Sequence, residues 1–273
     1  MERRPYALLL AYDGAPFRGW QRQPGLLTVQ EAVEQALAAH LGRTLQIFGA
    51  GRTDAGVHAC GQVAHFHARL PVDLAALRRE LPGRLPAGVR LIDAREAHRS
   101  FHARSSATGK RYRYDFSWGD RRHPRAFWLG TAEPRWERAR EALRGLAGLP
   151  LLSGLASPSR DRKPAPPLTG WELVEADVKS VSLTVNGPAF RKHQIRNLAG
   201  HLAAVALGLA EPESLGTLAA LHRPWRGATA PPHGLTLLEV LYPPELDPFR
   251  DRPGGQGEAQ GEPRAITSAA TSR

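Results

Sequence analysis

The pattern of apolar and polar residues predicts the same order of strands and helices in both halves of the chain. Short apolar runs that stop at Gly, Pro or Asp are typical of strands, and apolar residues recur at helical spacing between them. In the first half, the capping box Thr28-Val29-Gln30-Glu31 marks the start of a helix. The expected elements of this half are strands at 6–12, 44–48, 62–67 and 89–92 and helices at 29–41 and 73–80.

The second half repeats this order of strand, helix, strand, strand, helix and strand, which is the ferredoxin-like split pattern. We therefore predict an α+β fold of two ferredoxin-like (RRM-like) halves, with a mixed, mostly antiparallel sheet and a central cleft. The expected strands of the second half are 110–118, 171–177, 181–185 and 235–241, and its expected helices are 136–146, 190–209 and 213–221.

These halves divide the chain into an N-terminal α+β domain at 1–104 and a C-terminal α+β domain at 105–246. The stretch 157–167 is rich in proline and charge, so we expect it to form an exposed loop. The segment 247–273 is rich in Gly, Pro, Gln and Ser. We expect it to be a disordered tail, because such a composition buries little apolar surface.

The chain is strongly basic, with a net charge of +11 and a pI near 10.7. Only four of its 37 cationic side chains are lysine, and arginine binds phosphate through paired hydrogen bonds. The charge therefore indicates an anionic partner such as a nucleic acid. A genome biased toward arginine codons explains the same excess, and both interpretations stay open.

Cysteine usage and hydropathy narrow the class of protein further. The single cysteine, Cys60, excludes an internal disulfide and a cysteine-rich zinc site. No apolar run approaches the length of a membrane span. We therefore expect a cytoplasmic protein that does not insert into a membrane.

The segment 49–59, Gly-Ala-Gly-Arg-Thr-Asp-Ala-Gly-Val-His-Ala, is the strongest candidate for a reactive site. Its three glycines let the backbone turn tightly and approach a ligand closely. The loop holds one carboxylate, Asp54, and one fixed cation, Arg52, whose charge favours the ionised form of Asp54. An ionised carboxylate can act as a nucleophile or as a general base, so the pattern predicts a reactive carboxylate loop.

A cluster of cations at the start of the predicted helix 190–209 is the second candidate. The positive end of the helix dipole favours anions, so cations there call for an anionic neighbour. A phosphate or a carboxylate from the other half would serve, and a solvated run of charges is the alternative. The cluster consists of Arg191, Lys192, His193 and Arg196.

The strand 110–118 offers aromatic rings beside arginines. Tyr112 shares one strand face with Tyr114, while Arg111 and Arg113 share the other. Aromatic rings beside arginines suit stacking on an unpaired base. The alternative is that Tyr112 belongs to the ordinary core with its hydroxyl satisfied.

As a string, Gly-Arg-Thr-Asp-Ala-Gly-Val-His-Ala resembles the signature of the tRNA pseudouridine synthase A family. The resemblance extends over nearly the whole chain up to about residue 243, and Gln194 departs from it because the family usually has methionine there. Six blocks follow the family's order: 12–30, 49–59, 101–104, 110–114, 190–200 and 230–243.

This resemblance implies the pseudouridine synthase fold and a role for each matching residue. Asp54 would be the essential catalytic aspartate, Tyr112 would stack against the target uracil, and Arg196 would pair with Asp54 across the cleft. Arg52 would help to hold the loop and to displace the target base. Further contacts with RNA are expected from Arg22, Gln23, His58, Arg104, Lys110, Arg111, Arg113, Arg191, Lys192 and His193.

The reaction implied is the isomerisation of uridine to pseudouridine in the anticodon stem-loop of tRNA, at tRNA positions 38, 39 and/or 40. It needs no cofactor and no metal. The resemblance also implies a homodimer whose two subunits share one tRNA. The residues leave open whether Asp54 attacks as a nucleophile or removes a sugar proton, since both routes need its ionised form.

Two other classes of function compete with this one. A metal enzyme would use the group Asp54, His58, Cys60, His65 and His67, but no zinc or deaminase signature accompanies these residues. A non-catalytic tRNA-binding or RNA-folding module is the second alternative, because paired α+β halves often bind RNA without chemistry. The set of Asp54, Tyr112 and Arg196 favours the enzyme, since binding alone needs no carboxylate that faces a phosphate-rich ligand.

Overall fold

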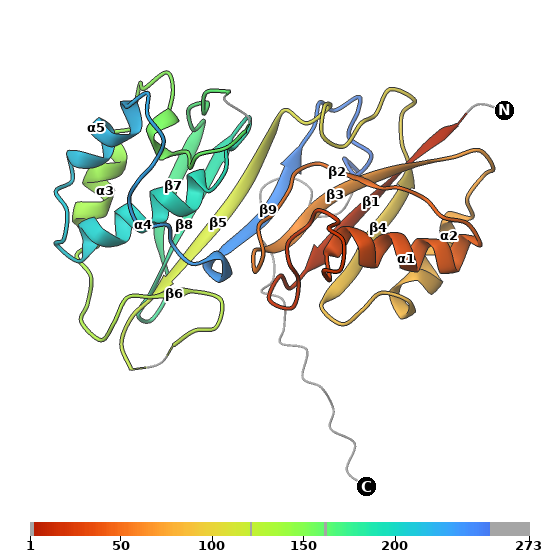
Figure 1. The fold of residues 1–273 in the computed structure, drawn as a ribbon, viewed down its shortest axis with the longest axis horizontal. Coiled ribbons are helices and arrows are strands. Elements are labelled where there is room, and N and C mark those ends of the chain that lie inside the picture. Colours follow the sequence, from red (N-terminus) through yellow and green to blue (C-terminus); the bar gives the residue numbers. More distant parts are fainter. Residues whose placement is uncertain (1–2, 121, 161–162, 252–273) are drawn as a thin grey trace, which may run out of the picture.

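The computed structural model describes residues 3–120, 122–160 and 163–251, and it contains a single continuous sheet (Figure 1). The main path of the sheet has the order β4-β1-β3-β9-β5-β8-β7, and the short strands β2 and β6 pair with β3 and β5. The strands are β1 Arg4–Tyr12, β2 Phe48–Gly49, β3 His58–Ala68, β4 Val89–Glu96, β5 Gly109–Ser117, β6 Phe127–Trp128, β7 Gly170–Asp177, β8 Ser180–Gly187 and β9 Leu235–Leu241.

Each half of the sheet has the strand order of a ferredoxin-like unit. In each half the fourth strand lies beside the first, the first beside the third, and the third beside the second. The order is β4-β1-β3-β2 in one half and β9-β5-β8-β7 in the other. Figure 1 shows α1 and α2 at one end of the sheet and α3, α4 and α5 at the other, with β5 and β9 between the two groups. The predicted fold class is therefore confirmed. The helices are α1 Val29–Leu41, α2 Leu74–Glu80, α3 Trp136–Arg144, α4 Gln194–Ala206 and α5 Ser214–Ala220, with short 3-10 turns at Leu81–Gly83, Ser153–Leu155 and Pro232–Gly234.

The two halves are joined by backbone pairing at the centre of the sheet. β9 runs antiparallel to β5 within its own half and parallel to the start of β3, where His58 faces Thr236. A close approach of the two backbones follows at Gly61, where a Cβ would lie only 2.3 Å from the carbonyl oxygen of Leu238. Since only glycine lacks a Cβ, Gly61 lets β3 and β9 come this close together.

Helix α1 begins as the capping box predicts, because the Thr28 hydroxyl accepts a hydrogen bond from the backbone N–H of Glu31 at 3.4 Å. The predicted strand 44–48 is wrong except for its last residue, and the cause is tertiary. The backbone N–H of Ile47 donates to Glu34 at 3.0 Å and its carbonyl accepts from Gln30 at 3.1 Å. Side chains of α1 therefore take the backbone groups of Ile47 that a neighbouring strand would otherwise use.

Helix α4 begins at Gln194, four residues later than the hydrophobic spacing predicts. His193 precedes it with a φ of 58°, the left-handed region, which a regular helix cannot include. Arg191 and Lys192 thus lie before the helix rather than in its first turns. The expectation that four cations crowd the first two turns of this helix is wrong, and only Arg196 lies there.

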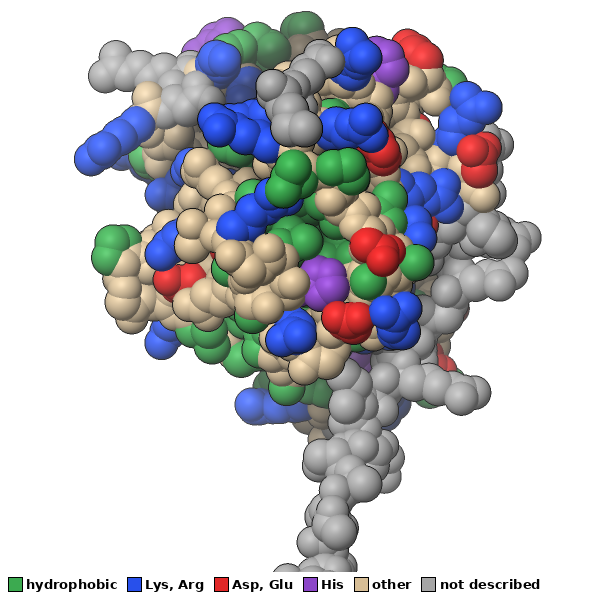
Figure 2. Space-filling view, turned by 90° about the vertical axis from the view of Figure 1, so that its right-hand side faces the viewer, with side chains coloured by type: hydrophobic (Ala, Val, Ile, Leu, Met, Phe, Trp, Pro, Cys, Tyr) green, Lys and Arg blue, Asp and Glu red, His purple; other side chains and the backbone are tan. Residues whose placement is uncertain are grey.

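The segment after β9 is packed as far as the structure describes it. Phe249 is buried, and the guanidinium of Arg95 lies 5.8 Å from the centre of its ring. Phe249 of the expected tail is therefore packed against the folded body, and residues 252–273 lie outside the described residues. Among the helices that are described, none has both the length and the apolar character that crossing a membrane requires. At the end of the molecule that carries α2, basic side chains are spread among acidic and apolar ones (Figure 2).

The close approach of β3 and β9 leads to a stability prediction. Gly61→Ala should lower the free energy of unfolding by about 1–3 kcal/mol, the usual cost of overpacking, because the new methyl group meets backbone that cannot move aside. Urea denaturation measures the change. Gly83→Ala is the matched control, since a Cβ there meets nothing within 4 Å. Equal stability of the two variants would show that β3 and β9 separate without cost.

Candidate active site

The Asp54 loop connects β2 to β3 and is held by the segment that follows β1. The backbone N–H of Trp20 donates to the carbonyl of Thr53 at 3.1 Å, and the Tyr12 hydroxyl lies 2.9 Å from the Thr53 hydroxyl. Within the loop, the N–H of Val57 donates to the carbonyl of Asp54 at 3.1 Å. These bonds fix the backbone on both sides of Asp54, so the carboxylate projects from a rigid turn.

Two glycines let the segment that follows β1 lie directly on the Asp54 loop. A Cβ at Gly14 would lie 2.1 Å from the carbonyl oxygen of Val57, and Gly19 has a φ of 89° that L-residues rarely adopt. His58 supports the same contact, because its Nδ1 accepts a hydrogen bond from the N–H of Gly14 at 3.2 Å and lies 3.1 Å from Asp13. Burial lowers the pKa of His58, against the opposing charge of Asp13. At 3% exposed, His58 supports this turn and is not among the predicted RNA contacts that line the cleft.

Asp54 meets Arg196 across the cleft between the two halves. Nη1 of Arg196 donates to Oδ2 of Asp54 at 3.0 Å, and its Nε donates to the carbonyl of Ala230 at 2.8 Å. The N–H of Ala230 donates back to the backbone carbonyl of Arg196 at 3.0 Å, so Ala230 contacts both the backbone and the guanidinium of Arg196. The structure thus brings together the two residues that the resemblance pairs. The Arg196 side chain is 13% exposed and that of Asp54 is 41% exposed, so the pair lies at the floor of an open cleft.

His193 is a second neighbour of the Asp54 carboxylate. Its Nε2 lies 3.5 Å from Oδ2 of Asp54, and its Nδ1 lies 3.2 Å from the Ser157 hydroxyl. Its left-handed backbone costs about 1 kcal/mol, and the two contacts offset this strain. Burial lowers the pKa of His193, against the raising effect of Asp54. Both neighbours contact Oδ2, and Oδ1 has no hydrogen-bond partner within the described part of the chain.

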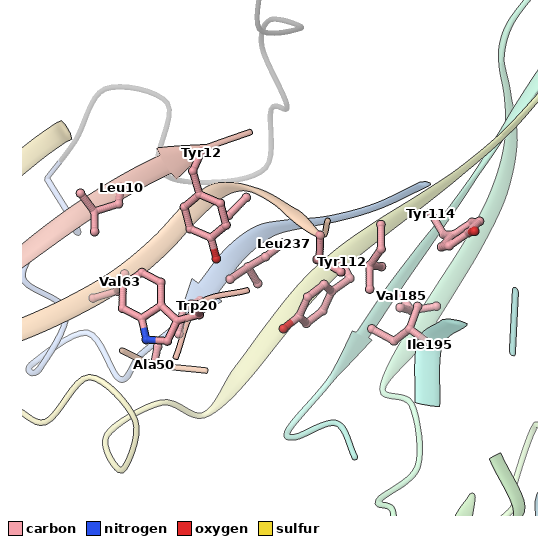
Figure 3. Close-up of a cluster of buried hydrophobic side chains, with 14 of the residues drawn as sticks. Leu10, Tyr12, Trp20, Ala50, Val63, Tyr112, Tyr114, Val185, Ile195 and Leu237 are labelled. Atoms are coloured by element: carbon pink, nitrogen blue, oxygen red, sulfur yellow. The ribbon is translucent and has the colours of Figure 1, made fainter. Parts of the chain in front are cut away.

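Tyr112 of β5 lies beside the Asp54 carboxylate. Its ring packs edge-to-face on Phe190 with centroids 5.2 Å apart, and both side chains line the cleft. Figure 3 shows Leu237 of β9 between Tyr112 and Tyr12, one tyrosine from each half. Burial raises the pKa of Tyr112 well above its usual value, and the charges of Tyr12 and Asp54 raise it further. Tyr112 therefore stays neutral and presents an aromatic ring rather than a proton acceptor.

The cleft has a volume of about 730 Å³ and a strongly basic lining. Burial, and then the charge of Arg104, lower the pKa of Lys110. Four of the predicted RNA-contacting or loop-holding cations of this lining are unpaired among the described residues. In residues 3–120, 122–160 and 163–251 their side chains have no hydrogen-bond or ion-pair partner: Arg52, Arg104, Lys110 and Lys192. Arg52 therefore does not pair with Asp54. Arg196 makes the contact with the carboxylate that the loop pattern predicts for Arg52.

Two predicted RNA contacts point away from the cleft. Nε of Arg111 donates to Asn186 at 3.1 Å, and the Arg111 guanidinium lies 3.7 Å from Glu239. Nε of Arg113 donates to Asp115 at 3.0 Å. Their positions follow from the strand period, which places them on the face opposite Tyr112. The structure does not bring Arg111 and Arg113 to the site, because their charges are used on the other side of the sheet.

Three other predicted contacts are also used within the protein. Arg22 lies 3.3 Å from Glu34 of α1, and Gln23 donates to the carbonyl of Arg18 at 3.3 Å, both outside the cleft lining. Arg191 lines the cleft, but its Nε donates to the carbonyl of Pro164 at 2.9 Å. Of the ten expected RNA contacts, the structure therefore places Arg104, Lys110, Arg191, Lys192 and His193 in the cleft.

Gln194, which departs from the family pattern, connects the two segments in front of α4. Its Oε1 accepts a hydrogen bond from the N–H of Arg191 at 2.9 Å, and its Nε2 donates to the carbonyl of Pro166 at 3.4 Å. Since the side chain is buried, these bonds satisfy both of its polar ends. Part of the expected exposed loop 157–167 is consequently tied down at Pro166, close to the cleft.

Two of the histidines considered as metal ligands, His65 and His67, pack against neighbouring imidazole rings instead. The His65 ring lies 4.6 Å from that of His102 and 5.2 Å from that of His67, measured between centroids. Over the described ranges, no three His, Cys, Asp and Glu side chains are placed to hold one metal ion. Sequence reasoning missed that Phe48 and His102 line the cleft. The available signal was their position, since Phe48 directly precedes the Asp54 loop and His102 lies in the 101–104 block.

Comparison with known proteins agrees with this geometry. The family model described as tRNA pseudouridine synthase matches residues 161–243. The chain is 39% identical to tRNA pseudouridine synthase A of Syntrophotalea carbinolica, an alignment that covers 87% of this chain and 96% of that protein. It is 36% identical to the protein of the same name from Geotalea uraniireducens, covering 88% and 100% of the two chains. For that of Myxococcus xanthus the identity is 37%, over 93% and 97%.

The two ferredoxin-like halves, their continuous sheet and these similarities place the chain in the class of proteins with the pseudouridine synthase fold. Relatives above 30% identity that align over nearly their full length narrow the class further. The chain belongs to the tRNA pseudouridine synthase A family. The resemblance inferred from the six sequence blocks is thereby confirmed.

The burial of His65 leads to a prediction about acid stability. His65 is buried and its Nδ1 accepts a hydrogen bond from the N–H of Ala103 at 3.2 Å, and burial lowers its pKa from 6.5 to about 4. Between these two values the unfolded chain binds more protons, so the free energy of unfolding should fall as the pH drops from 6.5 toward 4. His65→Asn keeps an acceptor but cannot be protonated, so its pH dependence should be shallower in urea titrations across this range. Identical slopes for the two proteins would contradict the assignment.

Proposed function

We propose that this chain isomerises uridine to pseudouridine in the anticodon stem-loop of tRNA, at tRNA positions 38, 39 and/or 40, with Asp54 as the essential catalytic carboxylate. The observation that carries the proposal is the contact between Asp54 and Arg196, with the Tyr112 ring beside it in one cleft. The names of the family's members support the substrate and the reaction. The anticodon stem-loop and the three positions rest on the sequence resemblance.

The cleft suits a nucleotide that has left its stack. Removing a base from a stem-loop costs a few kcal/mol. The lining offers Tyr112 as a stacking ring for the base. Arg52, Arg104, Lys110 and Lys192 offer charges for the flanking phosphates, and within the described residues no acid competes for them.

In the proposed reaction the bond between N1 of uracil and C1′ of the ribose breaks, the uracil turns, and C5 bonds to C1′. C5 then loses its proton and N1 gains one, so atoms and electrons balance without an oxidant or reductant. We therefore propose that the reaction uses no cofactor and no metal. Asp54 acts through its ionised form, as the nucleophile toward the nucleoside or as the base that removes a sugar proton. Arg196 stabilises that form in both routes because it donates directly to the carboxylate.

We further propose that the protein acts in the cytoplasm as a homodimer that shares one tRNA. The location rests on the single cysteine and on the cytoplasmic substrate, and the oligomeric state rests on the resemblance. A non-catalytic RNA-binding module stays the alternative, and it differs in one measurable respect. A module would bind tRNA and leave its nucleosides unchanged.

The central test removes the charge of Asp54. Asp54→Asn should reduce pseudouridine formation in unmodified tRNA by at least about 100-fold, because neither a nucleophile nor a base survives the change. Its affinity for tRNA should stay level or rise, since a negative charge facing RNA is lost. Nucleoside analysis in EDTA and a binding titration measure the two effects. Asp120→Asn is the control, because Asp120 is exposed with no partner in the described chain. Loss of tRNA binding in Asp54→Asn would make Asp54 structural, and wild-type protein that binds tRNA without forming pseudouridine would favour the binding module.

A second test concerns the phosphate contacts. Arg104→Ala should weaken tRNA binding and lower the slope of log K against log salt by about one unit, because one counterion fewer is released. Arg84→Ala removes an exposed arginine outside the cleft lining and should leave the slope unchanged. Titrations between low and moderate salt concentration measure both slopes. Equal slopes for wild type and Arg104→Ala would assign that charge to solvent.

A further inference from the structure

The cleft contains an exposed aromatic ring that the proposed chemistry does not use. Phe48 on β2 lines the cleft and is 40% exposed, whereas Trp20 and Tyr112 of the lining are buried and Phe190 is half-buried. One face of the Phe48 ring stacks on His65, with centroids 5.3 Å apart and an interplanar angle of 30°. β2 pairs only with β3 among the described strands, so Phe48 lies at an edge of the sheet.

The rings beneath Phe48 are fixed in place by backbone hydrogen bonds. Nδ1 of His102 accepts from the N–H groups of Arg104 and Ser105, both at 3.1 Å, and its ring lies 6.1 Å from that of Phe48. Nδ1 of His65 accepts from the N–H of Ala103 at 3.2 Å. A ligand that stacks here meets rings that are already ordered, so little conformational entropy is lost on binding.

One cation, Lys110, lies against the segment that connects Phe48 to Asp54. The stem of Lys110 lies against Gly51, where a Cβ would be 3.1 Å from its Cε, and Gly51 lies midway between Phe48 and Asp54 in the sequence. Six residues span at most about 20 Å, so the Phe48 ring lies within a few nucleotides of a uridine at Asp54. Aromatic rings with adjacent unpaired cations are what single-stranded RNA needs for its bases and phosphates.

We propose that Phe48 and His102 form a second base-binding site, a stacking platform for an unpaired RNA base that flanks the target uridine. The proposal rests on the proposed function and adds to it a site that recognises a neighbouring nucleotide. The base stacks on the outer face of Phe48, and Lys110 and Arg104 hold the phosphates between this base and the uridine. Phe48 does not touch the reacting atoms, so the platform contributes to binding and to the choice of uridine rather than to the chemical step.

The first experiment compares Phe48→Ala with Phe48→Trp in binding and turnover of unmodified tRNA. Loss of a stacked base weakens binding by about 5- to 150-fold, so Phe48→Ala should raise Kd and KM within that range and leave kcat unchanged. Phe48→Trp keeps a ring and should bind within about threefold of wild type. Leu70→Ala is the control for loss of an exposed apolar side chain, since Leu70 is 53% exposed and lies outside the cleft lining.

The second experiment identifies the stacked base. tRNA transcripts that carry a single abasic ribose at successive positions around the modified uridine are titrated with wild type and Phe48→Ala. At one position the two losses should not add, because the same contact is removed twice. Additive losses at every position, or an unchanged Kd for Phe48→Ala, would overturn the platform. Pseudouridine formation by the wild type would still support the proposed function in that case. Wild-type protein that forms no pseudouridine would overturn both.

Discussion

Backbone pairing of β9 with β3 and β5 is the constraint on which the site depends. Asp54 belongs to the first half of the chain, whereas Tyr112 and Arg196 belong to the second. They meet because β9 completes the second ferredoxin-like unit and at the same time extends the sheet of the first at His58, four residues after Asp54. The pseudouridine synthase fold therefore produces its cleft from a sheet junction, and the Asp54 loop lies where the junction holds it rigid.

The charges of the cleft follow an arrangement that favours an RNA ligand. The protein pairs or hydrogen-bonds many of its cations, including Arg22, Arg111 and Arg113. Inside the cleft the described chain leaves Arg52, Arg104, Lys110 and Lys192 without partners. Burial lowers the pKa of Lys110, because a buried charge without a partner is unfavourable. An anionic backbone in the cleft would supply the partners that these cations lack.

Local sequence signals predicted the elements that depend on local contacts. The capping box at 28–31 and the strand period around Tyr112 are examples, because a hydroxyl reaching its own helix or a side chain alternating across a strand needs no distant partner. The failures have tertiary causes. Ile47 loses its strand partner to Gln30 and Glu34 of α1, and helix α4 starts late because His193 takes a left-handed backbone to reach Asp54 and Ser157. Asp54 and its pairing with Arg196 were predicted from the sequence resemblance, whereas the contact of Asp54 with His193 required the fold.

The asymmetry of the Asp54 contacts connects the fold to the proposed chemistry. Arg196 and His193 both contact Oδ2. Oδ1 has no partner in the described structure, and the Asp54 side chain is 41% exposed. A carboxylate held through both oxygens would be ionised but blocked, and one held through neither would be mobile. Contact through a single oxygen fixes the orientation of the group and leaves Oδ1 open to the nucleoside. The same geometry serves attack on the sugar and removal of its proton, because each route needs one unpaired oxygen on a positioned, ionised carboxylate.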